Sequence, residues 1–159
     1  MKRSATHATF TIERLYRVPV ARVFNAFSDP DAKAQWFIGG DGWKEIRRED
    51  DFRVDGRERL TGRSADGTIT DYESRYEEIV PDERIVYTYH MSHDEKKLSI
   101  SLATIQFEQL ASGTKLTLTE QMTCLDGYDD VDGRDRKQGV TQHLNRVDEL
   151  LQRITAGSN

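Results

Sequence analysis

Residues Arg136–Ile154, with the sequence RKQGVTQHLNRVDELLQRI, decide the fold of this 159-residue chain. Apolar side chains recur there at spacings of four, three, four and three residues: Val140, Leu144, Val147, Leu151 and Ile154. This period places them on one stripe of an α-helix, which Gly157 would end. Since a helix cannot bury such a stripe alone, the preceding chain has to supply a complementary apolar surface.

The N-terminal part of the chain predicts one strand followed by two short helices. The strand is expected at Thr9–Val18, with Phe10, Ile12 and Leu15 among polar neighbours. Pro19 suits the first position of a helix that continues to about Ser28. Asp29 and Pro30 then combine an N-cap with a proline in the first turn of a second helix, which reaches Trp36 and Phe37 before glycines 39, 40 and 42 end it.

Short strands separated by tight turns, such as Asp55-Gly56 and Asp66-Gly67, follow from Trp43 onward and predict an antiparallel meander of about six strands. In Leu98–Phe107 the apolar residues change parity, so we expect a β-bulge near Ala103. The order of strand, two helices, strands and long helix is an α+β layout in which one antiparallel sheet faces one helix.

Side chains expected to face the interior share one parity within each of three strands. They are Tyr72, Ser74, Tyr76 and Val80 in the first, Ile85, Tyr87, Tyr89 and Met91 in the second, and Leu116, Leu118, Glu120 and Met122 in the third. The interior is therefore expected to be unusually rich in tyrosine and to contain a carboxylate.

Length, charge and cysteine content limit the class of protein. The chain suits a single domain, residues 1–159, with a core at about residues 9–154. Its net charge of −5 at pH 7, with both signs interleaved, argues against nucleic acid and acidic membranes as partners. The sequence shows neither a transmembrane segment nor a signal peptide, and the single cysteine, Cys124, fits a cytoplasmic location.

Several landmarks of the sequence, in their order and spacing, resemble the domain homologous to the activator of Hsp90 ATPase. They are VPVARVF at 18–24, Ser28-Asp29-Pro30, Trp36-Phe37, Asp66-Gly67, EIVPDER at 78–84 and IVYTY at 85–89. The resemblance covers roughly Thr9–Ile154 and implies membership of the START-like, or Bet v 1-like (SRPBCC), superfamily. It implies a helix-grip fold, in which a curved antiparallel sheet wraps around a long C-terminal helix.

The same resemblance implies a cavity between sheet and helix that holds a small apolar molecule, and a homodimer through exposed strand edges. The eukaryotic activators carry a separate N-terminal Hsp90-binding domain, whereas this chain starts directly at the first strand. An Hsp90-type chaperone is therefore not the partner that we expect.

Aromatic side chains are the main candidates for the walls of such a cavity, where they would hold a hydrophobic or aromatic molecule. The predicted ligand-binding residues are Trp36, Phe37, Tyr72, Tyr76, Tyr87, Tyr89, Glu120, Met122, His143 and Val147. The alternative is ordinary core packing, with the phenolic hydroxyl groups reaching water at a cavity mouth.

Glu120 is the candidate for acid–base chemistry, because an inward carboxylate has a raised pKa unless a cation or donor lies beside it. His143 and Arg146, on the flank of the C-terminal helix, are the expected partners, and Glu120 with His143 could act as general acid and base. Alternatively, Glu120 lies beyond the closed core and meets solvent or a salt bridge.

Other motifs do not predict a site. His90 and His93 have no third metal ligand, and the acidic segment Asp126–Asp135 has the composition but not the ligand positions of a calcium loop, so we expect no metal and no cofactor. The charged segment Lys44–Arg59 is expected to form an exposed strand face and hairpin, and Gly39-Gly40 a flexible lip of the cavity.

Three functions remain. A ligand-binding module is favoured because no motif for covalent catalysis occurs. The alternatives are a cofactor-independent cyclase-like or dehydratase-like enzyme that uses Glu120 and His143, and a protein-interaction domain of the Hsp90 co-chaperone type.

Overall fold

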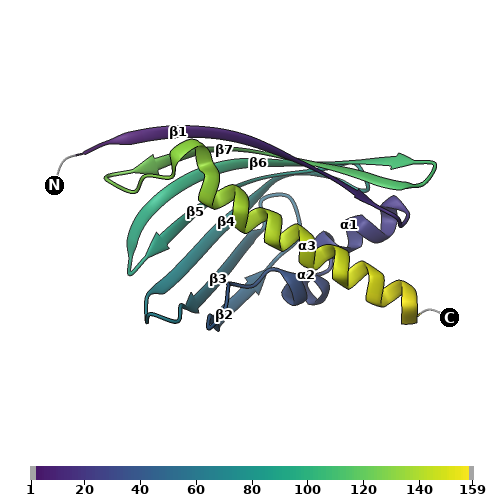
Figure 1. Cartoon of the computed structure of the whole chain (residues 1–159), viewed down its shortest axis with the longest axis horizontal. Coiled ribbons are helices and arrows are strands. Elements are labelled where there is room, and N and C mark those ends of the chain that lie inside the picture. The colour runs from purple at the N-terminus through teal and green to yellow at the C-terminus, as the bar shows by residue number, and fades with distance from the viewer. Residues whose placement is uncertain (1–2, 158–159) are drawn as a thin grey trace.

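The computed structural model describes residues 3–157, which form one antiparallel sheet and three α-helices (Figure 1). The strands are β1 (Ala5–Tyr16), β2 (Lys44–Asp50), β3 (Arg57–Arg63), β4 (Ile69–Val80), β5 (Arg84–His93), β6 (Lys96–Leu110) and β7 (Gly113–Leu125). The helices are α1 (Val20–Ser28), α2 (Pro30–Trp36) and α3 (Arg134–Gly157), and a 3-10 turn at Val131–Gly133 precedes α3.

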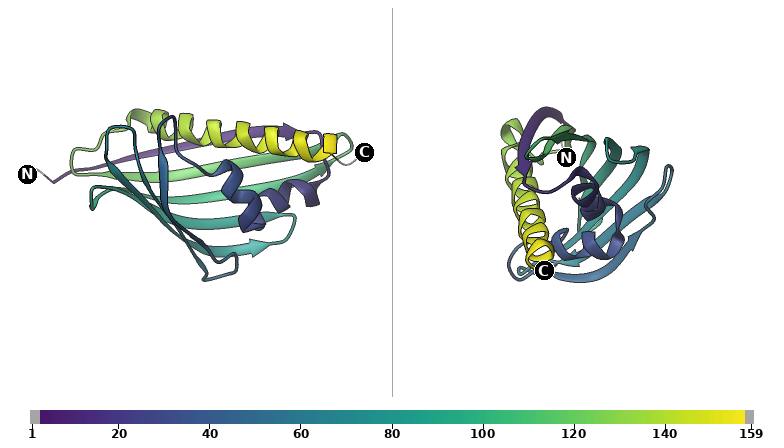
Figure 2. Two further views of the ribbon diagram at one scale, coloured as in Figure 1. Left: turned by 90° about the horizontal axis from the view of Figure 1, so that it is seen from below. Right: turned by 90° about the vertical axis from the view of Figure 1, so that its right-hand side faces the viewer.

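The sheet has the strand order β1-β7-β6-β5-β4-β3-β2, so the first two strands of the chain form its opposite edges. Helices α1 and α2 carry the chain from one edge to the other, and every other connection joins neighbouring strands. The sheet curves around α3, which crosses its inner face (Figure 2). This arrangement confirms the predicted α+β helix-grip fold.

The two short helices form where local sequence signals place them. Helix α1 follows Pro19 and buries Val23, Phe24 and Phe27. The Asp29 side chain accepts a hydrogen bond from the Asp31 backbone N–H at 3.1 Å and so caps α2, whose first residue is Pro30. The start of α2 was correctly predicted, and α1 begins one residue later than predicted, with Pro19 as its N-cap.

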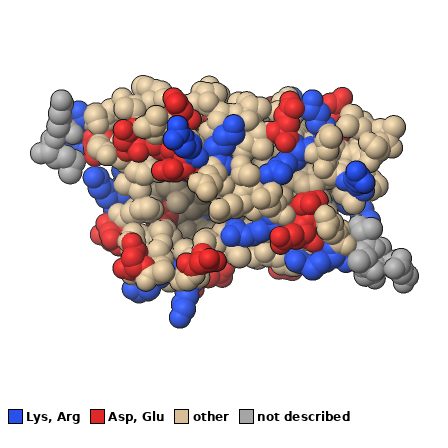
Figure 3. All heavy atoms as spheres, in the orientation of Figure 1, with Lys and Arg blue, Asp and Glu red and all other residues tan. Residues whose placement is uncertain are grey.

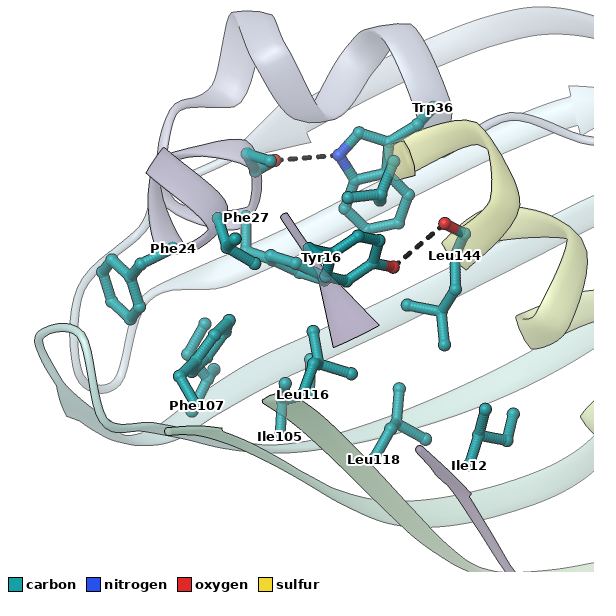
Figure 4. Close-up of a cluster of buried hydrophobic side chains, with 14 of the residues drawn as sticks. Ile12, Tyr16, Phe24, Phe27, Trp36, Ile105, Phe107, Leu116, Leu118 and Leu144 are labelled. Atoms are coloured by element: carbon teal, nitrogen blue, oxygen red, sulfur yellow. Dashed lines mark hydrogen bonds between the residues drawn. The ribbon is translucent and has the colours of Figure 1, made fainter. Parts of the chain in front are cut away.

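The apolar core lies between the sheet and the helices α1, α2 and α3, and Figure 4 shows a part of it. Phe107 packs edge-to-face against Phe24 and Phe27, with ring centroids 5.3 and 5.6 Å away. The Tyr16 hydroxyl donates to the Leu144 carbonyl at 3.0 Å and joins β1 to α3. These contacts attach α1 and α3 to the sheet.

Two apolar residues were wrongly assigned to the core. Leu15 is exposed, because strand alternation turns Phe10, Ile12 and Tyr16 inward and Leu15 outward. Ile154 is also exposed, whereas Leu150 is buried beside Leu151.

The β-bulge expected near Ala103 is absent: β6 pairs regularly with β5 from Ser99 to Gln106. The register shift instead falls at Leu98, between the pairs Met91–Ser99 and Ser92–Lys97. Small residues of β6, namely Ser99, Ser101 and Ala103, therefore face inward, and Ile100 and Leu102 lie on the outer face, 47% and 39% exposed. The bulge was predicted on the assumption that all apolar residues of this strand face inward. In the structure, the inner face of this part of β6 carries small side chains instead.

A bulge does occur in β4, between Tyr76 and Glu78. Before it, Tyr72, Ser74 and Tyr76 face inward as predicted. After it, Ile79 pairs with the buried Ile85 and packs on the core, so Ile79 takes the inward position that was predicted for Val80.

Within residues 3–157, no helix is both long and apolar enough to cross a bilayer.

Candidate ligand cavity

A cavity of about 390 Å³ lies between the inner face of the sheet, α2 and the N-terminal half of α3. A hollow is visible on this side of the molecule, and its walls are mostly side chains other than Lys, Arg, Asp and Glu (Figure 3). The predicted residues that line it are Trp36, Phe37, Tyr72, Tyr76, Tyr87, Tyr89, Glu120 and His143. Met122 and Val147, also predicted, are instead buried in the packed core.

Aromatic rings form a continuous wall along the sheet side of the cavity. Phe37 lies edge-on to Tyr72 with centroids 4.9 Å apart, and Tyr72 lies 4.9 Å from Tyr89. Tyr87 stacks on Tyr89 at 6.1 Å. Tyr72 in β4 and Tyr87 and Tyr89 in β5 lie on the inner face of the sheet, and Phe37, directly after α2, packs against Tyr72.

Glu120 is the most buried charged group of the cavity, with 1% of its surface exposed. Its Oε2 atom accepts hydrogen bonds from Tyr89 Oη at 2.7 Å, Ser101 Oγ at 3.0 Å and Arg136 Nη1 at 3.3 Å. Burial raises the pKa of the Glu120 carboxyl group, and the Arg136 charge opposes that rise. The inward orientation was predicted, but the partner is Arg136 and neither His143 nor Arg146.

Arg136 is held at the start of α3 by contacts on both its side chain and its backbone. Its guanidinium donates to Tyr89 Oη at 2.8 Å and Ser99 Oγ at 2.7 Å. The buried Asp130 carboxylate accepts from the backbone N–H groups of Asp135 and Arg136, at 2.8 and 2.9 Å, and so caps α3.

The acidic segment Asp126–Asp135 therefore includes a structural cap, a role that sequence reasoning missed. Within residues 3–157, no group of three or more His, Cys, Asp or Glu side chains is arranged to hold a metal ion. His90 instead lies 2.6 Å from Glu73, near the protein surface.

A second polar cluster lies beside the cavity, and the sequence analysis did not predict it. Lys33 Nζ lies 2.6 Å from Glu58 Oε1, and Tyr76 Oη donates to Asp50 Oδ1 at 2.8 Å. Burial raises the pKa of Glu58, and Lys33 opposes the rise. The expectation that Lys44–Arg59 is an exposed charged face is wrong for Glu58, whose strand parity matches that of the buried Leu60 and could have revealed it.

His143 fastens α3 to the segment that follows α2. Its Nε2 atom lies 3.0 Å from the Ile38 carbonyl, which also accepts from Arg146 Nη1 at 3.1 Å. Burial lowers the pKa of His143 to about 4, so the ring is neutral at pH 7 and its Nε2 proton can be donated to the carbonyl. Among the described residues, His143 and Glu120 make no hydrogen bond with each other, so the predicted acid–base pair is not assembled.

The glycines predicted as the cavity lip, Gly39 and Gly40, do line the cavity. Trp43 explains why a glycine occupies position 39, because a Cβ atom there would lie 2.2 Å from the Trp43 ring. A Cβ atom on Gly62 would lie 2.1 Å from the same ring. Trp43 Nε1 donates to Thr70 Oγ1 at 3.1 Å. The indole is thus fitted between two glycines at the edge of the cavity, an arrangement that involves residues far apart in sequence.

Solved structures of bacterial proteins share this architecture. A putative uncharacterized protein from Rhizobium leguminosarum is 42% identical, with a TM-score of 0.90 over 96% of this chain and 99% of that chain. The Mll3558 protein from Rhizobium loti is 35% identical, with a TM-score of 0.84 over 92% and 99% of the two chains. An AHSA1-like protein from Aeromonas hydrophila, 18% identical, has the same fold, with a TM-score of 0.67 over 92% and 94%.

The comparison with curated proteins found no match. The family model described as "Activator of Hsp90 ATPase homolog 1-like protein" matches residues 17–152, which include α1, α2, β2–β7 and most of α3. The chain therefore belongs to the family of activator of Hsp90 ATPase homolog 1-like proteins, with the Bet v 1-like helix-grip fold.

Proposed function

We propose that this protein binds a small, largely apolar molecule in the cavity between the sheet and α3. The observation that carries the proposal is the cavity of about 390 Å³, whose lining is largely aromatic and aliphatic. Small-molecule sites in proteins typically occupy roughly 300–1,000 Å³ and have apolar walls with a few well-placed polar groups. Glu120, Arg136 and Lys33 are polar groups of this kind, and each is held by partners within the protein.

The walls favour a flat ligand. Burying about 100 Å² of an aromatic face contributes roughly 2–3 kcal/mol before ordering costs, so contacts with several rings at once are needed for useful affinity. The rings of Tyr72, Tyr89 and Tyr87 follow one another on the inner face of the sheet, Phe37 packs against the first of them, and together they offer such contacts.

We favour binding over catalysis because Glu120 and His143, the two candidate catalytic residues, are already hydrogen-bonded to other groups of the protein. Glu120 is engaged by Arg136, Tyr89 and Ser101, and His143 by the Ile38 carbonyl. Neither side chain is left poised against the other for proton transfer.

Gly139 offers a way to test the proposal without disturbing the core. It lies on the stripe of α3 that lines the cavity, together with Arg136 and Val140, and a Cβ atom on it would meet no other atom within 4 Å. A larger side chain here can enter the cavity, and replacement of a helical glycine also favours the helix. Gly139→Phe should fill the cavity, and Gly139→Ala is the matched control.

The experiment is a thermal-shift screen of flat, mostly apolar metabolites, combined with native mass spectrometry of the purified protein. We expect compounds that raise the Tm of the wild type and Gly139→Ala but not that of Gly139→Phe. Absence of any bound mass or stabilisation across the set, or equal stabilisation of Gly139→Phe, would overturn the proposal.

A further inference from the structure

The hydrogen bonds of Glu120 are distributed unequally between its two carboxylate oxygens. The three donors, on Tyr89, Ser101 and Arg136, all contact Oε2. Oε1 accepts no hydrogen bond from any residue in the range 3–157 that the structure describes. A buried carboxylate oxygen without a donor is costly, so this atom provides a strong site for a donor that is brought by another molecule.

Oε1 is within reach of the cavity. In the described part of the chain, the polar side-chain atoms that are completely enclosed and unpartnered are Asp50 Oδ2 and Ser74 Oγ. Glu120 Oε1 is not one of them, and Glu120 is among the residues that line the cavity. A ligand in the cavity can therefore contact this oxygen.

Tyr87 supplies a complementary group in the same row of the sheet. Ala103 pairs with Tyr87 on one side and with Glu120 on the other, so all three side chains lie on the inner face of the sheet, with the smallest in the middle. Tyr87 and Glu120 both line the cavity. The Tyr87 ring stacks on Tyr89, but its hydroxyl group makes no hydrogen bond with any described residue. A free donor and a free acceptor thus lie on the two strands that flank Ala103.

We propose that the cavity selects flat, apolar molecules that carry a hydroxyl group, which donates to Glu120 Oε1 and accepts from Tyr87 Oη. This inference rests on the proposed binding function and specifies the chemistry of the ligand. A hydroxyl group is both donor and acceptor, so one substituent satisfies both protein atoms. An ether or ketone leaves Oε1 unpaired, and a carboxylate places a second negative charge beside Glu120.

The test compares three probes of one skeleton, naphthalene, 2-naphthol and 2-methoxynaphthalene, by isothermal titration calorimetry at pH 7. Because a hydrogen bond to a charged group is strong, 2-naphthol should bind the wild type roughly 10- to 100-fold more tightly than 2-methoxynaphthalene. Naphthalene affinity reports the integrity of the cavity in each variant.

Glu120→Gln is the informative variant. Three donors converge on the Oε2 position, so the amide oxygen takes that place and the amide NH₂ group replaces Oε1. The site then offers a donor, which ether and hydroxyl oxygens accept equally well, and the preference for 2-naphthol should fall close to unity. Glu108→Gln, the same substitution at an exposed position of β6, should keep the wild-type preference.

Tyr87→Phe provides a second variant in case Glu120→Gln does not fold. It should weaken 2-naphthol binding several-fold and leave naphthalene binding unchanged. Equal affinity of the wild type for the three probes would overturn this inference while the binding function stands, as would a preference for 2-naphthol that persists in both variants. Failure of all three probes to bind would count against the binding function itself, and the inference would fall with it.

Discussion

Lys33 and Glu58 form an ion pair of 2.6 Å inside the protein, with side chains that are only 9% and 2% exposed. The pair joins α2 to β3 and lies next to the cavity, where Lys33 Nζ is 4.9 Å from the centroid of the Phe37 ring. Tyr76 connects it to a further carboxylate, Asp50. The cluster therefore contains more acidic than basic groups, and the stability of the protein depends on keeping Lys33 in place.

Lys33→Met is expected to reduce the free energy of unfolding by about 3–5 kcal/mol, because it leaves Glu58 buried without a cation. The double variant Lys33→Met/Glu58→Met should lose less, since an apolar pair can replace a buried ion pair at little cost. Urea denaturation of the wild type, Lys33→Met, Glu58→Met and the double variant measures the coupling between the two residues. Additive losses in the double variant would contradict the prediction.

Asp130→Ala is expected to destabilise the protein by about 1–2 kcal/mol, because two N–H groups in the first turn of α3 lose their acceptor. The adjacent exposed residue provides the control: Asp129→Ala removes the same charge without removing a cap. Chemical denaturation of both variants checks this, and equal stabilities would show that the cap contributes nothing.

Because His143 is buried, the free energy of unfolding is expected to depend on pH in a specific way. Its pKa is about 4 in the folded protein and about 6.5 in the unfolded chain. Between these values the unfolded chain binds a proton that the folded protein does not, so the stabilising contribution is present above pH 6.5 and is lost as the pH falls to 4. This contribution is about 3 kcal/mol at pH 7.

His143→Gln tests this dependence, because glutamine can still donate to the Ile38 carbonyl but does not titrate. The stability difference between wild type and His143→Gln should shrink as the pH is lowered from 7 to 4, as measured by urea denaturation at several pH values. A difference that is constant with pH would show that His143 is protonated equally in both states.

Gly62→Ala is expected to displace the Trp43 indole, because the added methyl group would lie 2.1 Å from the ring. Overpacking of this kind costs about 1–3 kcal/mol. Tryptophan fluorescence should shift to longer wavelength as Trp43 becomes more exposed. Gly40→Ala is the control, since a Cβ atom there meets nothing within 4 Å, and an unchanged spectrum in Gly62→Ala would argue against the fitted position of Trp43.

Local patterns in the sequence were sufficient for the elements and for the class of fold. The apolar period of Val140, Leu144, Val147 and Leu151 specified α3 and its buried stripe, and Asp29 with Pro30 specified the start of α2. Strand parity correctly turned Tyr87, Tyr89 and Glu120 inward. These predictions succeeded because helical and strand periods depend on residues that are close together in the chain.

The partners within the cavity were decided only by the tertiary structure. Glu120 meets Arg136, and not His143, because the Asp130 cap fixes where α3 begins and Arg136 lies in its first turn. Tyr87 and Glu120 flank Ala103 because β6 stays in register where its apolar pattern predicted a bulge. Strand register and helix position depend on contacts between distant segments, so the sequence by itself determined which side chains face inward, and the packing of sheet against helix decided which of them meet.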